Sequence, residues 1–427
     1  MTWHKTLVRI IKIKDLRNSI IFVIGILVLF RFAAHIPIPV VNSENLSAFF
    51  AQNEIFGLIN IFSGGGLEAF SIVALGVAPY ITSSIIFQLL TMVIPSLEAL
   101  AKEGEAGRQR INQYTRVLVV PLAMLQGYGL VRLLQSSSAN VIPVDISILS
   151  FSTIIITLTA GTVFLMWLGE LISERHIGNG ISILIFAGIV SSIPGSIGNL
   201  FVNFEASEAQ NIVLFLIIAL VTIVGIVLIT EAQRNVPVSY ARRIRGMRMY
   251  GGTSAHLPLR VNQAGMIPII FAISLVLFPP LIAQFLTRIN NDFIVRASQF
   301  VMRIFQPDHI IYTTVYFLLV VGFTYFYTFV IFHPQQIAEN LQKQGGFIPG
   351  IRPGKTTADF LNHIVSRIVL AGALFLGVLA LLPFIMQLTT GLSIAISGAS
   401  LLIVVGVVID IVKQIESQLT MREYEGF

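Results

Sequence analysis

Residues 61–81 read IFSGGGLEAFSIVALGVAPYI and form an apolar stretch that is broken twice. Three consecutive glycines, Gly64, Gly65 and Gly66, weaken any helix through them, because glycine loses more conformational freedom on folding than other residues. Pro79 breaks the stretch again, because proline lacks a backbone donor and disturbs the turn of helix that precedes it. The stretch is apolar enough to enter a membrane. The rest of the chain has to explain what a broken hydrophobic segment does there.

The composition indicates a polytopic membrane protein. Of the 427 residues, 55% are hydrophobic and 11% are charged, whereas a soluble domain carries about 25% charged residues. The chain contains no cysteine, which excludes disulfides, thiolate nucleophiles and cysteine-ligated metal sites. Stability therefore has to come from packing in lipid.

Uncharged runs long enough to cross the hydrocarbon core, which takes roughly 20 helical residues, predict six clear spans. They lie at 69–97, 146–169, 177–204, 209–230, 261–287 and 310–337. The run 368–409 contains Pro383 and the turn-like LTTGLS, so it predicts two further helices. Weaker spans at 19–36 and 117–131 complete a set of ten. All but five of the 27 lysines and arginines then fall on one side, which predicts that both termini are cytoplasmic.

The segments between the predicted spans are short. The longest cytoplasmic segments have about 30 residues, too few for one segment to bury a core of its own, so we expect no soluble domain. The N-terminal residues 1–18 mix Leu7, Ile10 and Ile13 with basic side chains, which fits an amphipathic helix on the inner membrane surface. A solvated basic tail that only sets the topology is an equal alternative.

Several kinds of chemistry are disfavoured by spacing. The loop GIRPGKTT at 350–357 resembles a phosphate-binding loop, but it has one residue too few before Gly-Lys-Thr, and Pro353 removes an amide. The seven histidines are scattered and form no His-Glu-x-x-His motif, so no metal site is expected. No acidic residue lies at the middle of a predicted span, where an ion-coupled transporter would carry one. No Ser/His, Asp/Asp or metal set suggests an intramembrane protease, so we expect no enzyme activity and no cofactor.

Two features remain unexplained by topology alone. The first is a set of neutral polar residues in or beside the spans: Thr82, Ser83, Ser84, Gln88, Gln126, Asn262 and Gln263. Such residues often serve only to form hydrogen bonds between neighbouring helices. The cytoplasmic loops RNVPVSYARRIRGMRMYGG (234–252) and QKQGGFIPGIRPGKTT (342–357) are dense in basic and turn-forming residues. This density predicts docking to an acidic partner, such as ribosomal RNA or a motor protein.

Five long segments resemble the SecY family, the channel subunits of the Sec protein translocase. They are FSGGGLEAFSIVALGVAPYITSSIIFQLL, KEGEAGRQRINQYTR, MWLGELISERHIGNGISILIFAGIV, HLPLRVNQAGMIP and NLQKQGGFIPGIRPG. The resemblance covers essentially the whole chain, in order. It implies an all-α polytopic membrane protein, with ten transmembrane helices in two pseudo-symmetric five-helix halves around a central pore with a plug helix. The halves would be 19–204 and 205–413, followed by a cytoplasmic tail at 414–427.

The same resemblance implies the site residues. The plug would lie at about 59–70, which includes Phe62, Ser63, Gly64, Gly65, Gly66 and Leu67. An apolar pore ring would consist of Val77, Ile81, Ile181, Ile185, Ile270 and Ile403. The polar cluster of a lateral gate would be Thr82, Gln126 and Asn262. Docking residues for the ribosome and the SecA motor would lie in the loops 232–260 and 338–367: Arg242, Arg243, Arg245, Arg248, Arg352 and Lys355.

The implied function is a protein-conducting channel. It would pass unfolded polypeptides across the cytoplasmic membrane and release hydrophobic segments sideways into lipid, with signal sequences and nascent chains as its cargo. SecE-like and SecG-like small subunits and the SecA ATPase would be its partners. Met247 and His176 stand where the family often has arginine and glycine. The alternative function is a secondary transporter that recognises a neutral substrate.

Overall fold

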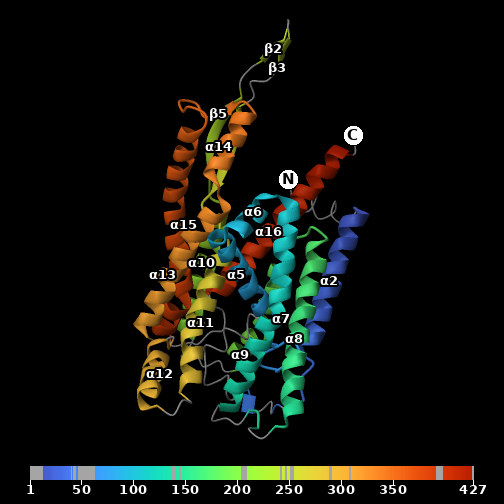
Figure 1. The fold of residues 1–427 in the computed structure, drawn as a ribbon, viewed down its shortest axis with the longest axis vertical. Helices are drawn as coiled ribbons and strands as arrows, with labels where there is room; N and C mark the ends of the chain where they lie inside the picture. Colours follow the sequence, from blue (N-terminus) through green and yellow to red (C-terminus); the bar gives the residue numbers. More distant parts are fainter. Residues whose placement is uncertain are drawn as a thin grey trace. The chain divides into compact units, whose positions relative to one another are not determined.

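The computed structural model describes residues 13–39, 41, 45–46, 63–136, 141–143, 146–202, 209–240, 243–245, 248–250, 254–287, 291–306, 309–390 and 398–425. It is mainly helical (Figure 1). The chain divides into two compact units: unit 1 consists of Met1–Ala206 and Val407–Phe427, and unit 2 consists of Ser207–Gly406. The last helix, α16 (Gly398–Glu425), begins in unit 2 and ends in unit 1.

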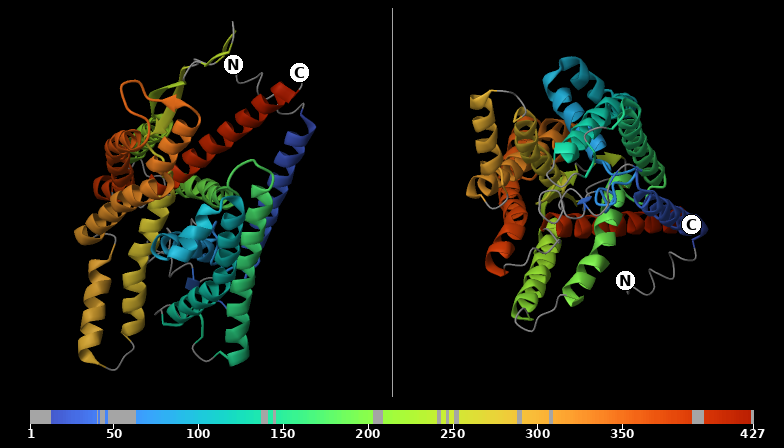
Figure 2. Two further views of the ribbon diagram at one scale, coloured as in Figure 1. Left: turned by 45° about the horizontal axis from the view of Figure 1, so that its top comes forward. Right: turned by 90° about the horizontal axis from the view of Figure 1, so that it is seen from below.

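Unit 1 is a bundle of long helices. They are α2 (Lys14–Ala34), α5 (Ala78–Val93), α6 (Pro95–Lys102), α7 (Glu105–Ser136), α8 (Ile148–Ser173) and α9 (Gly180–Val202). Helix α8 contacts α2, α7 and α9, and both figures of the fold show α2 and α8 side by side (Figures 1 and 2). The first turn of α8 is capped by Ser147, whose Oγ accepts a hydrogen bond from the amide of Ser150 at 3.1 Å.

The sequence predicts a span at 69–97, but helix α5 occupies only its middle. Before the helix, Gly76 takes a left-handed φ of 58° and Pro79 lies in the first helical turn, where its missing amide removes no helical hydrogen bond. After the helix, Ile94 is extended with a ψ of 111°, the conformation that a following proline favours. Because Pro95 then starts α6, the chain bends by 101° between the two helices.

Unit 2 holds the remaining helices. They are α10 (Ala209–Glu231), α11 (Ile267–Leu286), α12 (Asp292–Ile304), α13 (Ile310–Ile331), α14 (Pro334–Lys343), α15 (Lys355–Thr390) and the first turns of α16. Helix α13 packs along α15 and α11, and α14 packs on α15 (Figure 1). Helix α12 is amphipathic, since its sequence DFIVRASQFVMRI mixes apolar and basic residues at helical spacing.

Each of the ten expected spans overlaps a long helix of the described chain: α2, α5, α7, α8, α9, α10, α11, α13, α15 and α16. By length and apolarity, six of the described helices are able to cross a membrane, or seven if the bent pair α5 and α6 is one span. The expected boundary between two helices in the run 368–409 lies within the undescribed residues 391–397. The polytopic helical fold is therefore confirmed.

The loops of unit 2 at 232–260 and 338–367 contain strands that the sequence analysis did not predict. Strands β1 (Gln233–Tyr240), β4 (Ser254–Arg260) and β5 (Gly346–Phe347) form one antiparallel sheet in the order β4–β1–β5. A second hairpin, β2 (Arg243–Arg245) with β3 (Arg248–Tyr250), lies beyond this sheet (Figure 1). Each loop alone is too short to bury a core, but the two loops pair with each other. The fold is thus not purely helical, and we call this sheet with α14 and the start of α15 the loop lobe.

A shared core explains why the loop lobe is ordered. Its buried residues come from both loops and from the flanking helices α13 and α15: Val236, Val238, Leu259, Phe332, Ile348, Leu361, Ile364, Val365 and Val369. Alternation along β1 places Val236 and Val238 on the inner face while their neighbours are exposed. Distant segments therefore supply together the apolar surface that neither loop has alone.

Gly161 in α8 gives a test of packing in unit 1. A Cβ at this position would collide with the carbonyl oxygen of Ile72, so the backbone of 63–77 lies directly on the helix. We expect Gly161→Ala to destabilise the protein by about 1–3 kcal/mol, as overpacking does, and to lower the midpoint of thermal unfolding in detergent. Gly25→Ala in α2 is the matched control, because a Cβ there meets nothing within 4 Å. Equal midpoints for the two variants would contradict this packing.

Candidate functional site

The centre of the candidate site is the turn segment, which we define as residues 63–77. Its backbone forms successive turns, with the amide of Phe70 bonded to the Leu67 carbonyl at 3.0 Å and that of Ser71 to the Gly66 carbonyl at 2.8 Å. The side chains of Leu67, Phe70 and Val73 are 2%, 1% and 0% exposed. A non-helical segment is therefore part of the core of unit 1. Irregular backbone at membrane depth is tolerated only when it is buried in protein or lines a cavity.

The turn segment also stores backbone strain. Gly64 and Gly65 take left-handed φ values of 70° and 80°, which glycine adopts without a steric penalty. Phe70 takes a φ of 41°, and such conformations cost about 1–3 kcal/mol in other residues. The burial of the Phe70 ring offsets this cost. The segment is thus held in one particular conformation by its surroundings.

The plug residues predicted from the sequence fall partly within the turn segment. Phe62 and the residues from 59 to 61 lie outside the described part of the chain. Ser63, Gly64, Gly66 and Leu67 are buried, while Gly65 is half-buried. The expected helix is absent from 63–70, which forms turns. The Ser63 hydroxyl accepts a hydrogen bond from the Leu67 amide at 3.0 Å, and this contact closes the first turn.

The ring residues of unit 1 lie at two helix starts. Val77 is the N-cap of α5, and its carbonyl accepts a hydrogen bond from the amide of Ile81 at 3.0 Å. Val77 is 5% exposed and Ile81 is half-buried. Ile181 and Ile185 lie in the first two turns of α9; Ile185 is 2% exposed. Ile181 packs its Cδ1 onto Gly169 of α8, so it contacts the helix bundle of its own unit.

The ring residues of unit 2 lie near one contact between α11 and α16. The Met266 Cε lies 3.6 Å from the Cβ position of Gly406. Ile270 follows Met266 by one helical turn and is half-buried, while Ile403 precedes Gly406 by one turn and is 0% exposed. In unit 2, Ile270 and Ile403 thus lie one helical turn from either side of the same contact.

Two of the three predicted gate residues contact each other. The Gln126 Nε2 of α7 donates to the Thr82 Oγ1 of α5 at 3.4 Å, and Thr82 donates in turn to the carbonyl of Ala78 at 3.0 Å. Asn262 lies in unit 2 between β4 and α11 and is 7% exposed. Its side-chain oxygen is buried without a hydrogen-bond partner among the described residues. A buried oxygen left in this state costs about 1–3 kcal/mol.

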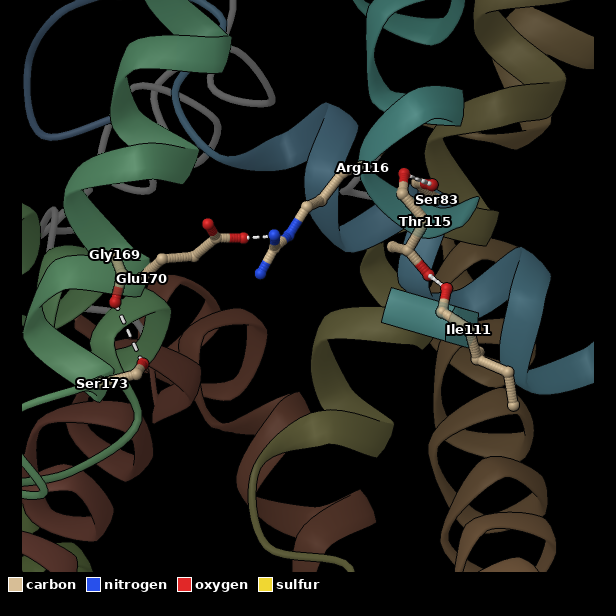
Figure 3. A network of polar contacts seen from close by, with 7 residues as sticks. All are labelled: Ser83, Ile111, Thr115, Arg116, Gly169, Glu170 and Ser173. Carbon is tan, nitrogen blue, oxygen red and sulfur yellow. Dashed lines mark hydrogen bonds and ion pairs between the residues drawn. The ribbon is translucent and has the colours of Figure 1, made fainter. Parts of the chain in front are cut away.

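A polar network beside the gate pair was not predicted (Figure 3). Arg116 of α7 forms an ion pair with Glu170 of α8 through a 2.5 Å contact from Nε to Oε1. The buried Ser83 of α5 donates its hydroxyl proton to the carbonyl of Thr115 in α7 at 2.7 Å. The sequence held a signal for the ion pair, because it places Arg116 and Glu170 at the cytoplasmic ends of consecutive spans. The network ties α5, α7 and α8 together.

Ser173 extends this network to α9. Its hydroxyl donates to the carbonyl of Gly169 at 3.0 Å and accepts from the amide of Gly180 at 2.9 Å. A Cβ on Gly180 would collide with the Gly169 carbonyl oxygen, so the start of α9 lies directly against α8. In the connecting turn His176 takes a left-handed φ of 55°. Glycine adopts this conformation without a steric penalty, whereas histidine does not.

The predicted docking residues that the structure describes lie in the loop lobe or on the β2–β3 hairpin beyond it. Arg242 lies outside the described residues, as does Met247; Arg243, Arg245 and Arg248 lie on the β2–β3 hairpin. Arg352 and Lys355 are exposed at the start of α15. In the loop before α15, Gly350 and Gly354 take left-handed φ values of 83° and 101°, and the Thr357 hydroxyl donates a hydrogen bond to the Arg352 carbonyl at 2.9 Å.

Sequence comparison finds relatives along the whole length of the chain. The family model described as SecY matches residues 71–412. A protein translocase subunit SecY from Streptomyces galbus is 45% identical over 98% of both chains. The protein of the same description from Halalkalibacterium halodurans is 46% identical over 99% of both chains. These relatives are aligned from end to end with the present chain, including the turn segment and the loop lobe.

Solved structures agree on the fold. One reported as the structure of a protein conducting channel matches with a TM-score of 0.62 and 17% identity, over 93% of this chain and 91% of the other. A second, from work on the plug domain of SecY, matches equally well. A third, Sec61 in the canine ribosome-channel complex, matches with a TM-score of 0.59 and 16% identity over the same shares of the two chains.

Proposed function

The chain belongs to the SecY family, and we propose from this premise how its own residues conduct and seal a polypeptide path. As a protein translocase subunit it is a protein-conducting channel. The observation that carries the proposal is the turn segment, a buried non-helical stretch within the helical bundle of unit 1. Non-helical backbone is tolerated at membrane depth when it is buried in protein or lines a cavity. A segment that closes a channel meets this condition.

The seal would have two layers. The segment 59–70 would act as a plug on the outer side, held by the buried turns and hinged at the glycines. The ring would form a constriction at the channel middle: Val77, Ile81, Ile181, Ile185, Ile270 and Ile403. A narrow apolar constriction excludes water and therefore ions by dewetting, while it offers a passing chain no directional bonds that would hold it.

The lateral gate would run along α5 and α7 in unit 1 and the start of α11 in unit 2. Thr82 and Gln126 support this assignment because their hydrogen bond is long and therefore easily broken. Asn262 would be the third member of the gate cluster, and its unpartnered side-chain oxygen could accept a hydrogen bond there. Opening the gate would let a hydrophobic segment leave the channel for lipid.

Thr82→Val gives a test of the gate. Valine keeps the shape of the side chain but removes the acceptor for Gln126, so the closed gate should lose a hydrogen bond of about 0.5–1.5 kcal/mol. We expect membrane insertion of a marginally hydrophobic segment to rise about two- to tenfold in reconstituted vesicles. Thr153→Val in α8 is the matched control, because the exposed Thr153 hydroxyl bonds the Leu149 carbonyl of its own helix. Equal insertion by both variants would count against the gate assignment.

The loop lobe would dock the energy source. Lys355 supports this role, because a cation at the first residue of α15 is disfavoured by the helix dipole and needs another reason to be there. We propose that Arg352, Lys355 and the arginines of the β2–β3 hairpin bind the SecA motor and ribosomal RNA. The channel itself would then hydrolyse nothing, and SecE-like and SecG-like subunits would complete it.

The basic loops also set the orientation. The protein is a membrane protein, and we propose the cytoplasmic membrane, with both termini and the loop lobe in the cytoplasm. The alternative of a secondary transporter has less support, since the relatives named above are described as translocase subunits and protein-conducting channels.

Reconstitution tests the proposal directly. Purified channel in vesicles, supplied with SecE-like and SecG-like subunits, motor and ATP, should carry an unfolded secretory precursor into a protease-protected space. A precursor without its signal sequence should stay accessible to protease. Vesicles that contain the channel with its subunits, motor and ATP but protect no precursor would contradict the proposal.

A further inference from the structure

Two attachments join the turn segment to α2 and to the residues that follow it. At one end, the Nη1 of Arg31 donates to the carbonyl oxygen of Gly64 at 2.5 Å. At the other end the attachment is made by main chain alone: the amide of Ile38 bonds the Phe70 carbonyl and that of Ile72 bonds the Ile36 carbonyl, both at 3.0 Å. The hydrogen bond of the first attachment therefore comes from a single side chain, whereas those of the second come from main chain.

The first attachment is tight at Gly64 and loose just after it. A Cβ on Gly64 would lie 2.9 Å from Cζ of Phe30 in α2 and 3.0 Å from Cα of Gly188 in α9. Its backbone is thus pressed between two helices. Gly65 has the same left-handed conformation, but a Cβ there meets nothing within 4 Å. The chain is fixed at Gly64 and has room to turn at Gly65.

The guanidinium of Arg31 suits a bond that holds but also releases. Arg31 lies in the last turn of α2, where a cation is favoured by the helix dipole. A charged donor makes a hydrogen bond about twice as strong as a neutral one. Because only one hydrogen bond joins the Arg31 side chain to Gly64, the loss of that bond is enough to release the side chain.

We propose that Arg31 is a latch on the plug. Its hydrogen bond to Gly64 fixes the start of the turn segment against α2 and α9, and breaking this bond frees Ser63 and Gly64 to move about Gly65 while the attachment at residues 70–72 remains. This inference rests on the proposed plug function. It makes Arg31 a positioning residue that sets how readily the channel opens.

A single cysteine reports the latch directly. The chain has no cysteine of its own, so Ser63→Cys, one residue before Gly64 and 3% exposed as serine, provides one site for a water-soluble maleimide. The full channel complex in vesicles is labelled with Arg31 intact and with Arg31→Leu. Because a hydrogen bond from a charged donor is lost, we expect labelling in Arg31→Leu to be about tenfold faster or more. Arg31→Lys retains a cationic donor and should fall between the two.

Two controls separate the latch from general loosening. Arg132→Leu removes another guanidinium from unit 1, one that stacks on Tyr128 and Phe151, and labelling should stay at the rate measured with both arginines intact. Gly64→Ala should speed labelling more than Gly65→Ala, because both place alanine at a left-handed φ but the methyl group collides with its neighbours at Gly64 only. Equal effects of the two alanines would assign their change to backbone strain and contradict the tight packing of Gly64 between α2 and α9.

Ion conductance of the same channels distinguishes the latch from the plug. Faster labelling together with higher conductance supports both proposals. Unchanged labelling in Arg31→Leu overturns the latch whatever the conductance is. Faster labelling without higher conductance supports the latch as the attachment of the turn segment and refutes the plug as a seal.

Discussion

Arg352→Glu is expected to lower motor-driven export by about 30- to 1,000-fold and to leave the channel inserted and folded. The size follows from the loss of a central charged anchor in a docking surface, which costs about 2–4 kcal/mol. An ordinary exposed ion pair contributes only about 0–1 kcal/mol. The measurements are the affinity of the motor for channel vesicles and the rate of precursor export.

The loop around Arg352 makes the result interpretable. Ile348, four residues earlier, is 3% exposed in the core of the loop lobe, and its carbonyl accepts a hydrogen bond from the amide of Ile351 at 3.0 Å. The loop is therefore held by contacts that do not involve the Arg352 side chain. Charge reversal should change docking without changing the loop.

Arg260→Glu is the matched control for this experiment. Arg260 ends β4 in the same loop lobe, is exposed, and undergoes the same change in charge. Its export should remain close to wild type, because the resemblance to the family assigns it no docking role. If Arg352→Glu binds the motor as tightly as wild type, Arg352 is not part of the docking surface. If export by Arg260→Glu falls as far as export by Arg352→Glu, the net charge of the loop lobe decides docking and Arg352 is not a specific anchor.

Ile81→Asn is expected to raise the ion conductance of the closed channel at least tenfold and to let precursors with weak signal sequences through. An amide in the constriction stabilises water there, which removes the dewetting barrier and lowers the barrier to plug displacement. Ile81 is the better choice for this test, because it is half-buried. Ile403 is 0% exposed, so Ile403→Asn also buries an amide and costs stability.

Ile156→Asn supplies the control for the ring. Ile156 lies in α8 of the same unit and is 61% exposed, so asparagine there should impair insertion or stability and leave the conductance per inserted channel unchanged. Conductance is therefore normalised to the amount of folded channel. Equal conductance in Ile81→Asn and wild type would remove Ile81 from the constriction.

The sequence predicted the helices well because a membrane constrains them locally. An uncharged run has to satisfy its backbone internally and has to be about 20 residues long, so each predicted span contains or overlaps a helix. The breaks inside the runs are less visible. Residues 69–77 are as apolar as a span, and only the left-handed Gly76 and the proline that follows show where α5 begins.

The loop lobe shows what local reasoning did not predict. Loops of about 30 residues cannot bury a core singly, but β1 of one loop pairs with β5 of the other through Ser239 and Phe347. Pairing across more than 100 residues of sequence depends on where α10, α11, α13 and α15 bring the loops. No periodicity within either loop carries that information.

By itself the sequence determined the membrane class, the ten helices, the family and the residues worth testing, because hydrophobicity, charge and motif are properties of consecutive residues. Tertiary structure alone decided which of those residues meet. It brought Gln126 to Thr82 and Arg116 to Glu170, and it set the Arg31 guanidinium on the Gly64 carbonyl, 33 residues away. The physical reason is that a shift of a few tenths of an ångström decides whether two groups form a hydrogen bond or collide. Helix packing sets those distances, and the sequence encodes the packing only through all its long-range contacts together.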